Sequence, residues 1–82
     1  MIVDAVPRIQ AVRFSRQAVA EAESLVGHSI TIEDCEGAFS GTIESMFNSL
    51  FVPEGNWIVR HGANLFVMSE SEFVKLYRVV DL

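Results

Sequence analysis

One segment organises the rest of the chain: Pro53-Glu54-Gly55-Asn56-Trp57-Ile58-Val59-Arg60-His61-Gly62. It has the pattern of a turn, a strand and a second turn. Pro and Gly adopt backbone angles that other residues resist, and Trp57 and Val59 alternate with Ile58 and Arg60. Trp57 is the only tryptophan in the chain. We therefore expect the core to condense around its large apolar ring.

Length and composition set the class of the protein. The chain has 82 residues, enough for a single domain over residues 1–82. Half of its residues are hydrophobic, so some apolar area is expected at a subunit or partner interface, and a homodimer is one expectation. No apolar run approaches the ~20 residues of a membrane helix. The start lacks a secretory pattern, and Cys35 has no second cysteine to pair with. These features predict a cytoplasmic protein that does not associate with membranes.

Charge is distributed unevenly along the chain. The net charge is −5, and between Gln17 and Val59 there are acidic residues but no basic ones. The acids are Glu21, Glu23, Glu33, Asp34, Glu36, Glu44 and Glu54. Phosphate backbones repel such a domain, so we expect no direct nucleic-acid binding. The acidic middle either attracts a basic partner surface or is a solvated face that confers solubility.

The pattern of apolar residues predicts an α+β fold. We expect a small, mostly antiparallel sheet with one amphipathic helix after the first strand and a short helix before the last strand. Residues 4–7 are expected to be an extended lead-in. The expected strands are residues 9–14, 29–33, 38–44, 50–52, 57–60, 65–68 and 77–80. The strands 29–33 and 38–44 form one hairpin, and 57–60 and 65–68 form another.

Signals at the helix ends support both helices. Ser15 can cap a helix over residues 16–26, and Gly27 lies where a left-handed C-cap belongs. Ser69 and Glu72 have the spacing of a capping box, which predicts the start of the short second helix. The aromatic residues after Trp57 are expected to form a core cluster with it: Phe66, Phe73 and Tyr77. This cluster would fasten the C-terminal hairpin and the capped helix onto one sheet, with the acidic middle facing outward.

Two further segments support a resemblance. Near the start the chain has Pro7-Arg8-Ile9-Gln10-Ala11-Val12-Arg13-Phe14, and near the end it has the pair Phe73 and Tyr77. With residues 53–62 between them, the chain resembles a family of small phage and prophage proteins of unknown function. That family opens with Pro-x-x-(Ile/Val)-Glu-Ala-x-x-(Trp/Phe). It closes with Pro-Gly-Asp-(Trp/Tyr)-Ile-(Ile/Val)-x-Gly-x-x-Gly-Glu and a Phe-x-x-x-Tyr pair. The shared order and spacing extend over nearly the whole chain.

The chain also departs from that family's pattern. Gln10 stands in place of the usual Glu, Glu54 is inserted between Pro and Gly, and Asn56 replaces Asp. The segment Leu65-Phe66-Val67 lacks the later Gly-Glu. The resemblance implies a phage or prophage origin, a compact α+β domain and a place in the host cytoplasm. It implies no chemistry.

The residues that commonly carry chemistry do not have the spacing of a reactive site. His28, His61 and Cys35 supply at most three metal ligands and are not closely spaced. The acidic segment from Glu33 to Glu36 is too short for a calcium loop. Gly55 and Gly62 lack the order of a phosphate-binding loop. We therefore expect no enzyme activity, no cofactor, and no catalytic, cofactor-binding or metal residues.

The expected function is that of a non-enzymatic, phage-encoded accessory protein. It would bind and inhibit a host protein or defence complex, for example CRISPR machinery, through an acidic surface and exposed aromatic residues. The candidate partner-binding residues are Glu33, Asp34, Glu36, Glu44, Asn56, Trp57, Arg60 and His61. The alternative is a self-associating structural or assembly protein of a phage particle.

Overall fold

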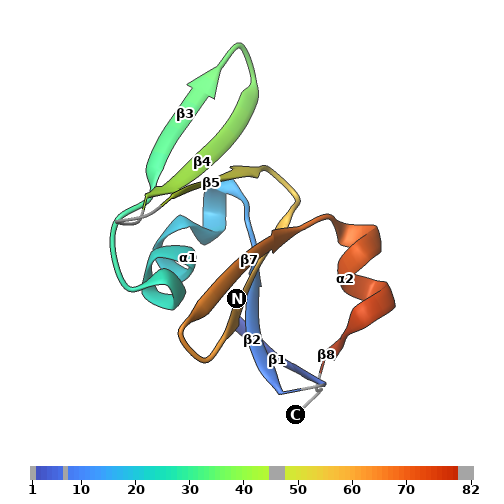
Figure 1. The fold of residues 1–82 in the computed structure, drawn as a ribbon. Coiled ribbons are helices and arrows are strands. Elements are labelled where there is room, and N and C mark those ends of the chain that lie inside the picture. The colour runs from blue at the N-terminus through green and yellow to red at the C-terminus, as the bar shows by residue number, and fades with distance from the viewer. Residues whose placement is uncertain (1, 7, 45–47, 80–82) are drawn as a thin grey trace.

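Five antiparallel strands form the main sheet in the part of the chain that the structure describes (Figure 1). The structure is a computed structural model and describes residues 2–6, 8–44 and 48–79. The strand order is β7-β6-β2-β1-β8. The strands are β1 (Ile2–Val6), β2 (Ile9–Arg13), β6 (Trp57–His61), β7 (Asn64–Met68) and β8 (Arg78–Val79). The sheet therefore joins the two ends of the described chain to the C-terminal hairpin.

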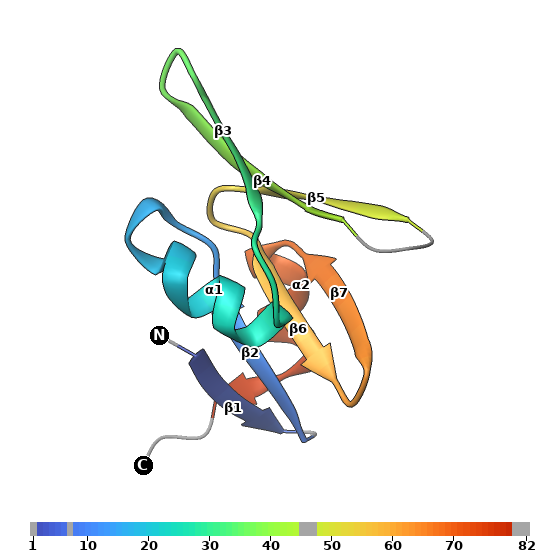
Figure 2. The same ribbon diagram turned by 90° about the vertical axis from the view of Figure 1, so that its left-hand side faces the viewer.

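A second antiparallel sheet lies across the main one. Its order is β3-β4-β5, with β3 (Thr31–Cys35), β4 (Ala38–Glu44) and β5 (Ser49–Pro53). The hairpin of β3 and β4 extends well beyond the rest of the molecule (Figure 2). Three apolar residues of this sheet, Phe39, Ile43 and Val52, are buried in the core cluster that includes residues of the main sheet and the first helix.

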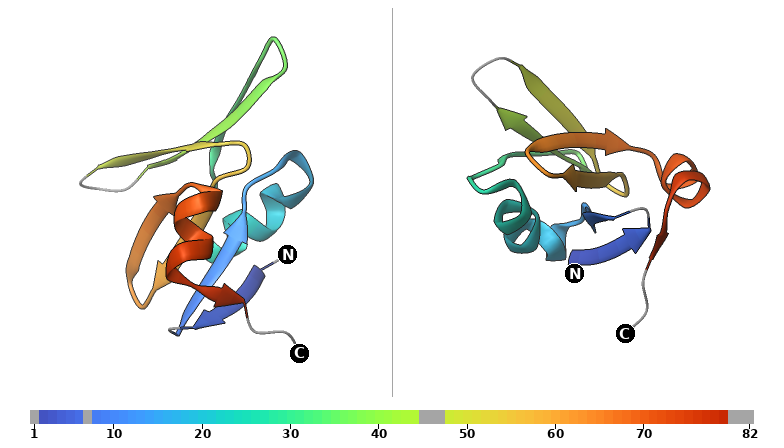
Figure 3. Two further views of the ribbon diagram at one scale, coloured as in Figure 1. Left: turned by 90° about the vertical axis from the view of Figure 1, so that its right-hand side faces the viewer. Right: turned by 60° about the horizontal axis from the view of Figure 1, so that its bottom comes forward.

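Helices cover both faces of the main sheet. A 3-10 turn, η1 (Arg16–Ala18), leads into α1 (Val19–Val26), which packs against β1, β2 and β6. The second helix, α2 (Glu70–Leu76), lies on the opposite face (Figure 3). Since successive residues of a strand point to opposite faces, each central strand contributes to two separate cores.

The two cores divide the central strands residue by residue. On the α1 side, Val12 and Ile58 pack with the helix and the second sheet. On the α2 side, Ala11 and Val59 pack with Phe73. All five of these residues are buried. This arrangement accounts for much of the high hydrophobic content, which is used inside the domain and not only at an interface.

Two of the predicted signals at the helix ends, the capping box and the Gly27 C-cap, are confirmed, and the Ser15 cap is not. Ser69 accepts a hydrogen bond from the backbone N–H of Glu72, whose side chain accepts one from the N–H of Ser69, so the capping box is complete. Gly27 takes the left-handed conformation (φ 95°) at the end of α1. Ser15 makes no side-chain cap, and the helix begins instead through η1.

The α+β class, the helix after the first strands and the short helix near the end are confirmed. The strands, however, divide between two sheets and not one. Residues 4–6 of the expected lead-in belong to the strand β1, which the sequence analysis does not predict. The reason is that Val3 and Ala5 face one core while Ile2 faces the other. Such a strand has no alternation of polar and apolar residues. Pro7 and Val80, parts of expected elements, lie outside the described residues.

The sequence predicts a core centred on Trp57, and this prediction is wrong. Phe14 and Phe73 are the largest fully buried side chains among the described residues, whereas Trp57 is half-buried at the margin. Phe14 directly follows β2 and stacks on Phe39, with ring centroids 5.4 Å apart. Phe66, expected in the core, is 47% exposed because it lies on β7, the edge strand beside α2.

Gly41 lies where the second sheet packs closely against the core. A Cβ atom there would lie 2.8 Å from both Ile30 Cγ2 and Phe14 Cζ, two buried side chains that have no room to move. We expect Gly41→Ala to lower the free energy of unfolding by about 1–3 kcal/mol through overpacking. Urea denaturation measures this effect. The control is Ser40→Ala, at the neighbouring position that faces outward, and equal midpoints for the two variants would contradict the packing described.

Candidate protein-binding surfaces

The outer face of the second sheet is an exposed surface that no described helix or strand covers. Its inner face carries Phe39, Gly41, Ile43 and Val52, all buried. The register also places Ile32, Asp34 and Leu50 on the inner side, and by alternation the remaining residues of these strands point outward. They are Thr31, Glu33, Cys35, Ala38, Ser40, Thr42, Glu44, Ser49, Phe51 and Pro53. Each of them is exposed or half-buried.

Phe51 is the largest apolar side chain on this outer face and is 62% exposed. Its neighbours Leu50 and Val52 take the inward positions, which leaves the phenyl ring outside. The strand register places Phe51 opposite Thr42. Glu44 is therefore a diagonal neighbour of Phe51, and the Cα atoms of such neighbours lie roughly 7–8 Å apart. Aromatic side chains are enriched at protein contact surfaces relative to the rest of a protein surface.

The hairpin tip projects a further carboxylate into solvent. Cys35 pairs with Ala38, so the turn consists of Glu36 and Gly37 alone. Both adopt positive φ, 52° and 84°, as a type I′ turn requires. This turn continues the right-handed twist of the strands. It holds Glu36 at the end of the hairpin, whose tip projects from the molecule (Figure 2).

Asp34 has a different environment, on the inner face of the hairpin. Arg16 donates two hydrogen bonds to its carboxylate, one of them 2.9 Å long, and the guanidinium carbon lies 4.7 Å from the centroid of the Phe39 ring. These hydrogen bonds lower the pKa of the Asp34 carboxyl below its ordinary value of 3.8. The ion pair therefore neutralises one predicted acidic site residue and ties the hairpin to η1.

The four predicted acids thus do not form one cluster. Glu33 and Glu44 lie on the outer face, Glu36 lies at the tip, and Asp34 is paired on the inner face. Because β4 spans roughly 20 Å at ~3.4 Å per residue, Glu36 and Glu44 lie at opposite ends of the hairpin. The acidic middle forms an extended strip of negative charge.

Trp57 and Asn56, also predicted to bind a partner, are built into the fold. The indole stacks on Phe73 with centroids 3.9 Å apart and rings 3° from parallel. Its Nε1–H donates to Glu70 at 2.5 Å, and Arg13 lies 3.5 Å from the same carboxylate. The backbone of Asn56 accepts from the N–H of Phe14 at 2.8 Å, and its own N–H is also hydrogen-bonded. Both residues support the turn between the sheets.

Arg60 acts as a cap for α1. Its guanidinium donates to the Leu25 carbonyl at 2.8 Å and to the Gly62 carbonyl at 3.0 Å. The last carbonyls of a helix lack partners within the helix and carry partial negative charge, so a cation stabilises them. His61 follows on the exposed end of β6, at the turn into β7.

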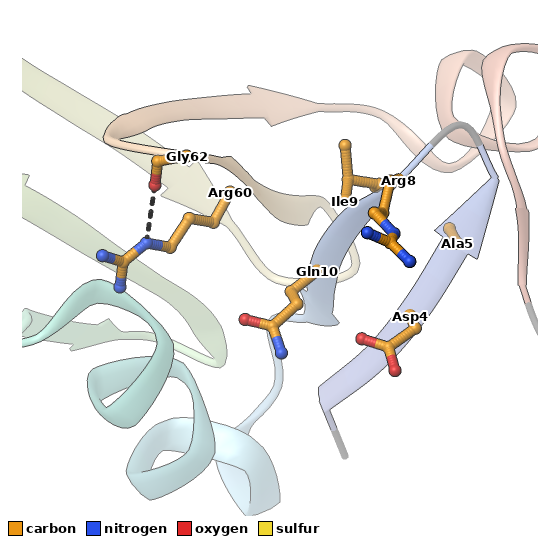
Figure 4. Close-up of a pocket in the computed structure, with 7 residues that line it drawn as sticks. All are labelled: Asp4, Ala5, Arg8, Ile9, Gln10, Arg60 and Gly62. Atoms are coloured by element: carbon orange, nitrogen blue, oxygen red, sulfur yellow. Dashed lines mark hydrogen bonds between the residues drawn. The ribbon is translucent and has the colours of Figure 1, made fainter.

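A polar hollow lies beside this cap (Figure 4). The strand register places Asp4 opposite Gln10 and Gln10 opposite Arg60, which forms a polar row across three strands. Arg8 and Gly62 complete the lining with the apolar residues Ala5 and Ile9. The four polar side chains are all exposed, and the charges of Asp4 and Arg8 oppose each other. Arg60 adds a second positive charge, which is directed at the Leu25 and Gly62 carbonyls. The hollow is therefore a solvated polar surface with a small positive balance.

Comparisons with protein-family models, with curated proteins and with solved structures found no match to this chain. Over residues 2–6, 8–44 and 48–79, no three His, Cys, Asp or Glu side chains converge in a way that would hold a metal ion. Neither helix in the same residues is long and apolar enough to cross a membrane.

Sequence reasoning missed Phe51 as a surface residue. The segment from Leu50 to Val52 is a run of three apolar residues, which indicates a strand but not which side chain faces out. The signal that identifies it is the polar character of its neighbours on the outer face, Ser49 and Thr42. That signal is readable only after the register is known.

We expect the Asp34 carboxyl to titrate below 3.8. Because this pKa is lower in the folded than in the unfolded chain, the ion pair stabilises the fold above the ordinary pKa, and its contribution is lost as the pH falls through the lowered value. Carboxyl-carbon NMR measures the titration. Arg16→Gln should return the pKa toward 3.8, whereas Arg13→Gln should leave it unchanged; the reverse result would contradict the pairing.

We expect Arg60→Met to lower the free energy of unfolding by about 1 kcal/mol, since it removes the hydrogen bond to the Leu25 carbonyl but keeps an apolar stem. Thermal unfolding followed by circular dichroism measures the change. Arg8→Met is the matched control, because Arg8 lines the same hollow and has no recorded ion pair or hydrogen bond among the described residues. If Arg60 does not cap α1, the two variants should have the same free energy of unfolding, and that result would contradict the capping role.

Proposed function

We propose that the protein is a protein-binding module that meets a partner through the outer face of its second sheet. The observation that carries the proposal is the 62% exposed side chain of Phe51 on a sheet face that also carries Glu33 and Glu44. Aromatic side chains dominate the binding energy of protein interfaces, and the surrounding polar rim excludes water from them. Phe51 is the anchor in this proposal.

The carboxylates indicate the chemistry of the partner. Glu33, Glu36 and Glu44 are exposed, and the structure records no ion pair for any of them among the described residues. A net charge of −5 adds a long-range field of the same sign. Such a surface attracts a basic partner and raises the association rate at low ionic strength. The partner we propose is therefore a protein with a basic surface that contains an apolar pocket.

A narrower form of the proposal concerns the biological setting. The resemblance to small phage and prophage proteins supports a phage-encoded accessory protein that inhibits a host protein or defence complex, CRISPR machinery being one example. A projecting strip of carboxylates is suited to a DNA-binding target, because carboxylates can lie where phosphates would otherwise bind. The uncharged edge of β7 favours the second candidate, a self-associating structural or assembly protein.

The test is affinity capture from a lysate of the host, with tagged protein and quantitative mass spectrometry. We expect the partner bound by the wild-type chain to be lost on Phe51→Ser, and its recovery to fall with Glu33→Gln/Glu44→Gln and with rising salt. Truncation of a central aromatic anchor commonly weakens binding by about 2 kcal/mol or more, which is roughly thirtyfold.

Two variants serve as controls. Val74→Ser removes an apolar side chain of almost the same exposure, 61% against 62% for Phe51, from α2. Asp4→Asn/Glu54→Gln changes the net charge by the same amount away from the outer face. Both should retain the partner. Equal loss with Val74→Ser, or unchanged capture with Phe51→Ser, would refute the proposed surface.

A further inference from the structure

The two sheets end in four edge strands within the described residues, and three of these edges are protected against pairing with another strand. β8 has only two residues, β3 carries Glu33 and Asp34, and β5 ends in Pro53, which has no N–H to donate. Short strands, charges and proline are the usual protections of an edge. β7 has none of them, since its sequence is Asn-Leu-Phe-Val-Met.

The open edge of β7 presents a defined set of backbone groups. Asn56 accepts a hydrogen bond from Phe14, so the even-numbered residues of the β6 segment point toward β2 and the odd-numbered ones toward β7. Val59 pairs with Phe66, which directs the N–H and C=O of Phe66 inward. The backbone groups of Leu65 and Val67 therefore point outward, and neither residue has a recorded hydrogen bond to a third described segment.

We propose that this edge pairs with β7 of a second copy of the chain, antiparallel and centred on Phe66. In that register, Leu65 of each copy lies opposite Val67 of the other, and the outward N–H and C=O groups form four hydrogen bonds. Asn64 lies opposite Met68. No charged residue meets another, so the edge is complementary to itself, as a two-fold interface requires.

Phe66 is the side chain that this register brings to the two-fold axis. It is 47% exposed and would form a pair without backbone hydrogen bonds, where the two Cα atoms are about 4.5 Å apart. Aromatic pairs at such positions add to the stability of a sheet. The main sheet would thereby continue from one copy into the other.

The flank of α2 extends this apolar edge. Phe73 points into the sheet, and Glu70 contacts Arg13 on β2, which lies away from β7. At 100° per residue, Leu76 lies on the opposite flank from Glu70 and hence on the side of β7. Leu76 is 59% exposed. Figure 3 shows β7 at the outer edge of the sheet beside α2. A second copy would bury Leu76 together with Phe66.

Sedimentation over a concentration series tests the proposal, with Phe66→Lys and Phe66→Glu as variants. The wild-type chain should dimerise. Each variant places like charges opposite each other and should weaken the dimer by about tenfold or more. An equimolar mixture of the two should recover association, because Lys then faces Glu. Both variants should stay folded, since Phe66 is half exposed and its backbone bonds to β6 are unchanged.

Val74→Lys is the control, at an exposed apolar position on α2 (61%, against 47% for Phe66) away from the proposed axis, and it should dimerise like the wild type. A wild-type chain that is monomeric throughout the concentration series overturns the proposal. The edge of β7 would then be available only to a strand of another protein. A dimer that survives Phe66→Lys, or a mixture of Lys and Glu variants that does not associate, overturns it as well. None of these outcomes depends on Phe51 or on a host partner.

Discussion

Burial on both faces of the main sheet is the constraint on which the rest of the structure depends. A domain of this length has little interior, and a sheet covered on one face alone would leave half of its side chains in water. Here α1 and the second sheet cover one face, and α2 covers the other. The central strands β2 and β6 therefore carry apolar residues at successive positions, such as Ala11 and Val12 or Ile58 and Val59.

The second sheet has the opposite character, because one of its faces meets the core and nothing in the described chain covers the other. Its inner positions are apolar and include Gly41, where only a hydrogen atom fits against Phe14 and Ile30. Its outer positions are polar except for a few, of which Phe51 is the largest. The fold thus has one free sheet face and one free apolar edge, and these are different surfaces with different chemistry. Binding to a charged partner suits the face, and pairing of strands suits the edge.

The local elements could be predicted from the sequence, whereas their assembly could not. The capping box of Ser69 and Glu72 and the C-cap at Gly27 are signals contained within a few residues, and both are found as predicted. The division of the strands between two sheets depends on contacts between distant residues, such as Phe14 with Phe39. The contacts of Arg60 and Trp57 could not be predicted for the same reason. Each makes its hydrogen bond to a residue far along the chain, a helix carbonyl for Arg60 and Glu70 for Trp57.

The proposed edge and the proposed face are related by symmetry. Residues opposite each other in a paired sheet point to the same side, so a two-fold axis through Phe66 runs perpendicular to the main sheet. This axis places the sheet faces that α1 covers, one in each copy, on the same side of the dimer. The two second sheets, with their acidic outer faces, would then lie on that same side. A bivalent molecule binds a repeated or symmetric partner more tightly than a single face would, because the second contact forms at a high effective concentration. In this way the proposed charge-steered contact at each Phe51 would gain affinity without a larger interface.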